Sequence, residues 1–197
     1  WIDFAEANAA DTVADIVNLD RGAAYEIQVR AENAVGAGDW LSGSRVTPDV
    51  PAAPTGLTAT TVTGQIGAIR LSWTAPAVAS GELAITDYVI QQSLDDGISW
   101  ATLDDAVSTT TTHDVTGRSR ADGAHVFRVA AKNVLPGVLE NELEFTQATT
   151  PVQPLGRSEA VRLLQAAAGD EQILLTWSAP SDTGGVAITD YLVEYQT

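Results

Sequence analysis

Cysteine is absent from this 197-residue chain. Neither a disulfide nor a thiolate metal site can therefore contribute, and thiols give no indication of the redox compartment. No run approaches the roughly 20 apolar residues that a membrane-spanning helix needs, and no signal peptide is recognisable. Because methionine is absent too and the chain opens on Trp1, we expect an internal piece of a longer polypeptide.

Basic residues are scarce. The chain has 10 Lys and Arg against 26 Asp and Glu, a formal charge of −16, and Lys132 is its one lysine. Such a surface repels phosphate backbones and anionic lipids. We therefore expect no nucleic-acid partner and no membrane insertion, and we interpret the acidity as a solubility feature rather than as a cation-binding one.

Aromatic residues make up 6% of the chain, whereas hydrophobic residues reach 45% and charged residues only 18%. This balance can fill a core and does not resemble a disordered segment. Val, Thr, Ala and Ile are plentiful and alternate with polar residues, which favours strands over helices. The composition predicts an all-β protein.

One stretch is repeated. Residues 68–91 read AIRLSWTAPAVASGELAITDYVIQ, and residues 172–196 read QILLTWSAPSDTGGVAITDYLVEYQ. Trp73 and Trp177 are 104 residues apart, and Tyr88 and Tyr191 are 103 apart. In the other half of the repeat, Asn33 and Asn133 are 100 apart. The chain therefore consists of tandem copies of roughly 100 residues.

Proline-bearing linkers divide the copies. Residues 49–54 and the start of 151–197 contain closely spaced prolines, which forbid helix and give short, stiff, extended connections. We assign 1–48 to the back part of one module, 55–150 to a complete module, and 151–197 to a linker with the front part of a third. The complete module has seven expected strands, which predicts a two-sheet antiparallel sandwich: 56–62, 68–74, 85–93, 98–104, 108–116, 124–133 and 142–149.

These residues resemble the fibronectin type III family, in its bacterial form, over essentially the whole chain. The matching elements are the tryptophan of LSWTAP and LTWSAP, the tyrosine of ITDYVI and ITDYLV, the run AYEIQVRAEN and the hairpin DDGISW. The resemblance implies tandem seven-stranded immunoglobulin-like β-sandwiches, with strands A, B and E facing C, C′, F and G. Residues 1–48 would then supply C′ to G, and 151–197 would supply A to C.

The resemblance also implies the core. Trp73 and Tyr88, with their repeats Trp177 and Tyr191, are the expected large core side chains. Tyr25 stands where the family places its tyrosine corner. His125 replaces that tyrosine in the second module, so we expect a looser corner there and a higher melting temperature for His125→Tyr.

The polar candidates do not form a recognised site. A metal site needs three or four converging ligands, and neither the pair His113 and His125 nor the neighbouring Asp114 provides that spacing. A second group of acidic residues could bind calcium, but solvated turn aspartates are the favoured interpretation: Asp95, Asp96, Asp104 and Asp105. We predict no catalytic residue, no metal and no cofactor.

Exposed aromatics are the remaining candidates for contact with a protein or glycan. Trp40, Trp100 and Trp1 lie at expected loop or edge positions where an indole can stack on a partner, or instead cover the flank of its own module. The loop of Trp40 reads AVGAGDW, without the Arg-Gly-Asp tripeptide of integrin-binding relatives. The loop between the repeated strands differs between copies, 77–83 against 181–186, and is a further candidate.

The sequence therefore predicts a non-catalytic spacer or interaction module from a tandem array of a secreted or cell-surface protein. Two alternatives stay open: an accessory region of an extracellular polysaccharide-degrading enzyme, and a carbohydrate- or protein-binding module that uses an exposed tryptophan. Because the partial end modules are complementary, we also expect head-to-tail self-association between copies.

Overall fold

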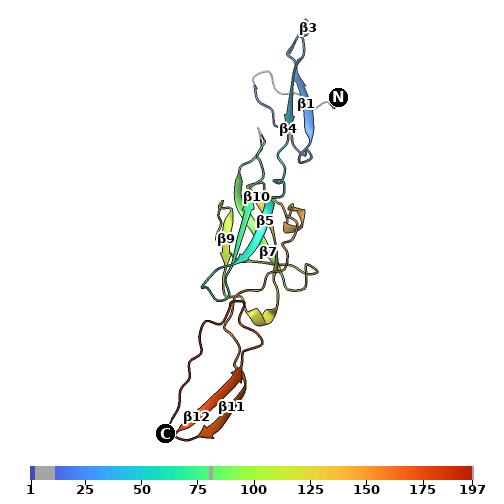
Figure 1. Ribbon diagram of the computed structural model, residues 1–197. Helices are drawn as coiled ribbons and strands as arrows, with labels where there is room; N and C mark the ends of the chain where they lie inside the picture. Colours follow the sequence, from blue (N-terminus) through green and yellow to red (C-terminus); the bar gives the residue numbers. More distant parts are fainter. Residues whose placement is uncertain (3–11, 80–81, 197) are drawn as a thin grey trace.

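The computed structural model describes residues 1–2, 12–79 and 82–196. Its sheets are all antiparallel and lie in three groups that follow one another along an elongated molecule, with the termini near opposite ends (Figure 1). In the part of the chain that the structure describes, no helix is long and apolar enough to cross a membrane.

The central group is a two-layer sandwich of the immunoglobulin type. One sheet has the order β5 (Thr55–Thr61), β6 (Ile69–Thr74), β9 (Thr112–Val115). The other has the order β10 (Val126–Asn133), β7 (Ile85–Ser93), β8 (Ala101–Thr102). Alternate residues of β6 are buried, as the period-2 pattern predicts. The all-β, antiparallel fold class is thus confirmed.

The core of the sandwich lies between these two sheets. Trp73 and Tyr88 are both buried in it, with ring centroids 5.1 Å apart and planes at 69°. This edge-to-face arrangement suits the positive edge and negative face of aromatic rings. Ile69, Phe127 and Val129 are fully enclosed beside them.

The expected seventh strand, 142–149, is wrong as a regular strand. Its start is a short 3₁₀ turn, η2 (Glu140–Glu142), and only Phe145 forms a bridge, to Ala130 of β10. The hydroxyls of Thr146 and Thr149 accept the N–H groups of Val129 and Phe127. These N–H groups would donate to carbonyls in a regular ladder, so threonine side chains replace part of the backbone pairing.

Two other expected strands are shorter than predicted. Segment 98–104 contains only β8, and segment 108–116 contains only β9. At the start of the second segment, the hydroxyl of Ser108 accepts the N–H of Thr110 at 3.1 Å instead of leaving it for a neighbouring strand. Side chains of this kind compete with the ladder for backbone groups.

The N-terminal group contains two small sheets. β1 (Ala24–Val29) pairs with β4 (Leu41–Val46), and β2 (Glu32–Asn33) pairs with β3 (Gly36–Ala37). The hydroxyl of Tyr25 accepts the N–H of Asp20 at 2.9 Å, the contact of a tyrosine corner. Strands expected before residue 17 fall mostly on 3–11, outside the described residues.

The C-terminal group is one hairpin, β11 (Arg162–Gly169) with β12 (Gln172–Ser178). Segment 187–196 repeats the sequence of β7, yet within the described residues it is not a strand, which corrects the expectation. Trp177 and Tyr191 pair edge-to-face at 5.4 Å and 67°, like their repeats. They are nevertheless not a buried core: Trp177 is half-buried and Tyr191 is 37% exposed, because no second sheet lies over this hairpin among the described residues.

Candidate functional site

Trp100 has an arginine stacked on one face of its indole ring. The guanidinium of Arg128, on β10, lies 4.3 Å from the centre of the Trp100 ring and 4.3 Å from that of Phe145. Such cation–π stacking shields the rings and the cation together, and burial lowers the pKa of Arg128. Trp100 is half-buried as a result. Of its two predicted roles, covering the flank of its own module agrees better with this geometry.

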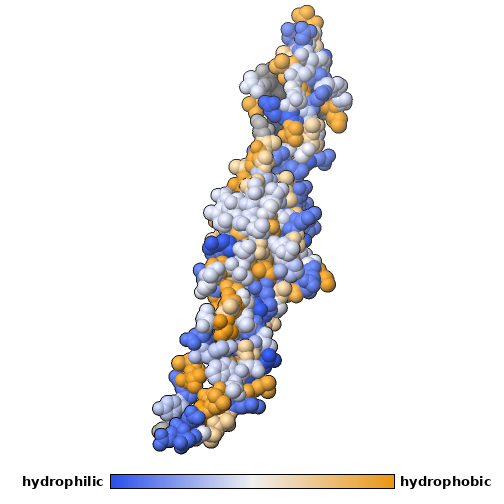
Figure 2. Space-filling model, viewed as in Figure 1, coloured by the Kyte–Doolittle hydropathy of each residue, from blue (hydrophilic) through white to orange (hydrophobic). Residues whose placement is uncertain are grey.

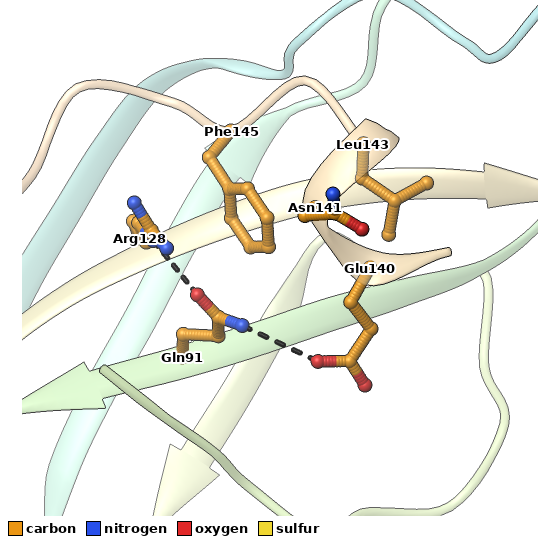
Figure 3. A pocket seen from close by; sticks show the side chains of 6 residues that line it. All are labelled: Gln91, Arg128, Glu140, Asn141, Leu143 and Phe145. Carbon is orange, nitrogen blue, oxygen red and sulfur yellow. Dashed lines mark hydrogen bonds between the residues drawn. The ribbon is translucent and has the colours of Figure 1, made fainter. Parts of the chain in front are cut away.

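The same arginine borders a shallow polar hollow of about 530 Å³ (Figure 3). Its Nε donates to Oε1 of Gln91 at 2.8 Å, and Nε2 of Gln91 faces Oε2 of Glu140 at 3.4 Å. That carboxylate oxygen also accepts from the hydroxyl of Thr102 at 2.8 Å. Gln91 thus joins Arg128 of the sheet to Glu140 of η2, and none of the residues lining the hollow is an activated nucleophile.

Trp40 is the more accessible tryptophan. It lies just before β4, with the guanidinium of Arg30 4.4 Å from its ring centre, and half of its surface (50%) is exposed. An indole beside a cation can pack on a sugar ring or on an apolar protein surface. Trp1 is also exposed.

The two histidines lie on different segments of the central sandwich. His113 is on β9, with Nδ1 3.8 Å from Oδ2 of Asp105; burial raises the pKa of that carboxyl. His125 is buried just before β10, where its Nδ1 lies 2.7 Å from Nε2 of Gln92. Across the described ranges, no group of three or more His, Asp or Glu side chains converges as metal ligands do.

The four candidate calcium ligands are not one cluster. Asp104 and Asp105 line a second hollow beside His113, apart from the β7–β8 turn. Asp95, in that turn, accepts from the hydroxyls of Ser93 and Ser99 and from the N–H of Ser99 at 2.6 to 2.9 Å. These donors, led by the Ser99 hydroxyl, lower the pKa of Asp95 to about 2. The carboxylate therefore organises the turn.

The joint between the central sandwich and the C-terminal hairpin is the best-defined polar site. Arg120 in η1 (Arg120–Asp122) donates from Nε to Oδ2 of Asp182 at 2.8 Å and from Nη2 to Oδ1 at 3.1 Å. The hydrogen bond from Arg120 is the main cause of a lowered Asp182 pKa. Nη1 of Arg120 also donates to the carbonyl of Pro154 in the linker, at 3.1 Å.

Loop 181–186 closes this joint on its other side. The N–H of Gly156 donates to the carbonyl of Gly184 at 3.0 Å. A Cβ on Gly184, whose φ is +78°, would lie 2.3 Å from the carbonyl oxygen of Gly156. The loop therefore contacts the preceding module and linker through Asp182 and Gly184. The Gly-Gly pair in this loop was a sequence signal that another backbone segment could approach closely. No feature of the sequence indicated that Arg120 belongs to the joint.

The joint at the N-terminal side uses different residues. Nη1 of Arg21 lies 3.6 Å from Oε2 of Glu142. Asn133 donates from Nδ2 to the carbonyl of Asp49 in the linker at 2.8 Å, and the N–H of Ala53 donates to Oε2 of Glu144 at 3.3 Å. At each joint, polar side chains connect a module to its neighbour and to the linker. The residues differ: the ion pair is Arg21 with Glu142 at the N-terminal joint and Arg120 with Asp182 at the C-terminal joint.

No family model matches the chain. Among solved structures, it is similar to a crystal structure of consecutive titin domains, with 23% identity and a TM-score of 0.45; the match covers 69% of this chain and 43% of that one. It is also similar to a titin module from human cardiac muscle, with 18% identity and a TM-score of 0.42, over 53% of this chain and 93% of the module. Both likenesses concern the fold.

Proposed function

We propose that this chain is a stretch of a tandem fibronectin type III array that serves as a non-catalytic spacer and interaction segment of a secreted or cell-surface protein. The assignment of modules is 1–48, 55–150 and 151–197, with 49–54 as a linker. The repeat of roughly 100 residues and the strand order of the central sandwich support it.

The joint at Arg120 carries this proposal. A spacer must hold consecutive modules at a fixed distance, and a flexible linker alone does not do so. Here one guanidinium joins the central sandwich, the Pro154 carbonyl and Asp182 of the following loop. The planar fork of arginine matches a carboxylate at two points, which restricts orientation as well as distance.

Single-molecule energy transfer between the two ends of the chain tests the spacer role. Because the chain has no native cysteine, Trp1→Cys and Tyr195→Cys provide the two label sites. A spacer gives a long, narrow distribution of end-to-end distances that changes little with salt. A Gly/Ser polypeptide of equal length is the flexible control, and a distribution as broad as that control would rule the spacer role out.

A carbohydrate- or protein-binding module is a second candidate, favoured by the exposed indole of Trp40; such a module could also be an accessory region of a polysaccharide-degrading enzyme. On a glycan array, Trp40→Ala is expected to abolish any binding while Trp100→Ala retains it, because half of the Trp40 surface (50%) is exposed and Trp100 is less exposed. Binding that is lost only in Trp100→Ala contradicts this assignment.

A further inference from the structure

Linker residues 152–155 are hydrogen-bonded to the central sandwich at every position. The N–H of His125 donates to the carbonyl of Val152 at 2.8 Å, and the N–H of Val152 donates back to the carbonyl of His125 at 2.9 Å. Three further bonds of 2.9 to 3.1 Å hold the next residues: Gln153 Nε2 to the Arg120 carbonyl, Arg120 Nη1 to the Pro154 carbonyl, and the Gly67 N–H to the Leu155 carbonyl. The space-filling view shows no gap between the central sandwich and the C-terminal part of the chain (Figure 2).

His125 lies buried beside this linker, and its neighbours fix its protonation state. The amide of Gln92, on β7, bridges two side chains. Its Oε1 accepts from Nη1 of Arg118 at 3.0 Å, and its Nε2 lies 2.7 Å from Nδ1 of His125. Because an amide nitrogen only donates, Nδ1 is the unprotonated acceptor of a neutral ring, and the ring proton is on Nε2. In the described structure that Nε2 has no hydrogen-bond partner.

A second proton on His125 breaks this chain of hydrogen bonds. The proton goes to Nδ1, which then faces the NH₂ group of Gln92 as donor against donor. Turning the amide over presents its oxygen to the ring but points the NH₂ group at Arg118, which also can only donate. No orientation of Gln92 satisfies both neighbours. Since an unsatisfied buried donor or charge costs free energy, the protonated ring favours a state in which it reaches water.

The charged groups around His125 compensate a second proton only in part. Arg118 repels a charged ring, while Asp122 and the Ser119 backbone favour it, and burial, the largest effect, leaves the pKa of His125 lowered. The neighbours described above from β7, β10 and the linker are neutral: Gln92, Phe127 and Val152. The closed joint therefore resists protonation of this ring.

We propose that the joint between the central sandwich and the following module is an acid-sensitive clamp, in which protonation of His125 releases linker residues 152–155 and lets the following module reorient. The release does not require the sandwich to unfold, because His125 lies at its corner and is not one of the residues of the core cluster. Segments outside a core open locally at a lower free energy than the whole domain.

The direction of the pH response follows from the two states of the ring. A ring that reaches water regains its usual pKa of about 6.5, whereas the closed joint holds a lower one. The closed state is therefore fully favoured above about pH 6.5 and loses up to about tenfold in its ratio to the open state between pH 7.5 and 5.5. The Arg120–Asp182 pair is not the sensor, because the hydrogen bond from Arg120 lowers the Asp182 pKa and keeps that carboxylate ionised.

Amide hydrogen exchange measured by NMR tests the release at the linker itself. The N–H of Val152 is hydrogen-bonded to His125 only while the linker is held. Its protection factor, corrected for the intrinsic exchange rate, is expected to fall up to about tenfold between pH 7.5 and 5.5. The N–H of Trp73, bonded to the Thr111 carbonyl beside the core, is expected to stay more protected at both pH values. An unchanged Val152 factor, or one equal to that of Trp73, would overturn the proposal.

Gln92→Glu is the sharpest variant, because it removes the conflict rather than the histidine. A carboxylate accepts from Arg118 and from a protonated His125 at once, so the Val152 protection factor should no longer fall in acid. His125→Gln, which cannot titrate, should give a flat profile too. His113→Gln is the matched control and should retain the fall. A fall that persists in Gln92→Glu and in His125→Gln would assign the pH response to other groups and overturn the proposal.

Energy transfer across this one joint tests the consequence for module orientation. Val107→Cys in the central sandwich and Ile173→Cys on β12 are exposed label sites. The distribution of distances is expected to be narrow at about pH 7.5 and broad at about pH 5.5, and Gln92→Glu should keep it narrow. The inference rests on the proposed spacer function, yet the two can fail separately. A broad distribution at the higher pH contradicts the spacer, whereas a narrow one at both values contradicts only the clamp.

Discussion

Arg120 and Asp182 lie 62 residues apart in the sequence and form a two-point ion pair, with nitrogen to oxygen distances of 2.8 and 3.1 Å. The pair joins the corner that precedes β10 to loop 181–186 beyond the linker. Both side chains are partly exposed, and exposed ion pairs add little to the stability of a module. We therefore expect its main effect on the orientation of consecutive modules.

Arg120→Ala is expected to loosen this joint without unfolding the central sandwich. The variant removes both bonds to Asp182 and the bond to Pro154, so the end-to-end distances measured by energy transfer should broaden while the melting temperature stays close to that of the unmodified chain. Arg120→Lys keeps the charge but not the two-point geometry, and should fall between the two. A distribution unchanged in Arg120→Ala would contradict the role assigned to this joint.

Gly67→Ala is expected to destabilise the central sandwich far more than Gly64→Ala. Both glycines have positive φ, +70° and +77°, so alanine costs each about 1 to 2 kcal/mol in backbone strain. A Cβ on Gly67 would also lie 2.4 Å from the carbonyl oxygen of Arg118, whereas a Cβ on Gly64 meets open space. The additional clash should bring the loss at Gly67 above about 3 kcal/mol, measured by urea unfolding. Equal losses of unfolding free energy in Gly67→Ala and Gly64→Ala would contradict this prediction.

The repeat allows the same substitution to be made in a covered and an uncovered sheet. Val129→Ala removes two enclosed methyl groups and should lower the free energy of unfolding by about 2 to 3 kcal/mol. Val29→Ala, at the exposed repeat position, should change it by less than about 0.5 kcal/mol. Both are measured by urea unfolding. A comparable loss at the two sites would show that the N-terminal face is covered.

Periodicity and repetition predicted most of the central fold, because the positions that bury side chains in β6 alternate in the sequence as they do in the sandwich. They could not predict segment 187–196. Its sequence closely repeats β7, but a strand needs hydrogen-bond partners from another segment, and the repeat of β10 lies at the other end of the chain. The local sequence of 187–196 therefore favours a strand, but whether a strand forms depends on a neighbouring segment with which it can hydrogen-bond.

The candidate site was less predictable, because its contacts join residues far apart in the chain. Trp100 resembles a free aromatic in the sequence, and nothing in its surroundings indicates that Arg128 stacks on it. The edge at 142–149 similarly depends on whether threonine hydroxyls or backbone carbonyls are the closer acceptors. These contacts depend on the tertiary structure, and they produce no periodic pattern in the sequence.

His125 should make the central sandwich less stable as the pH falls. Its side chain is 1% exposed, and in the described structure its Nε2 has no hydrogen-bond partner. Burial lowers the pKa of His125, and Arg118 lowers it further, against opposing effects from the Ser119 backbone and Asp122. The unfolded chain takes up a proton below about pH 6.5, while the folded chain resists it until its own lower pKa. The associated stability is therefore complete above about pH 6.5 and is lost as the pH falls from there through the folded pKa.

Melting temperatures between about pH 7.5 and 5.5 should decline in the unmodified chain and in His113→Gln, which leaves His125 in place, but should be nearly flat in His125→Gln. A decline that persists in His125→Gln would assign the effect to other groups.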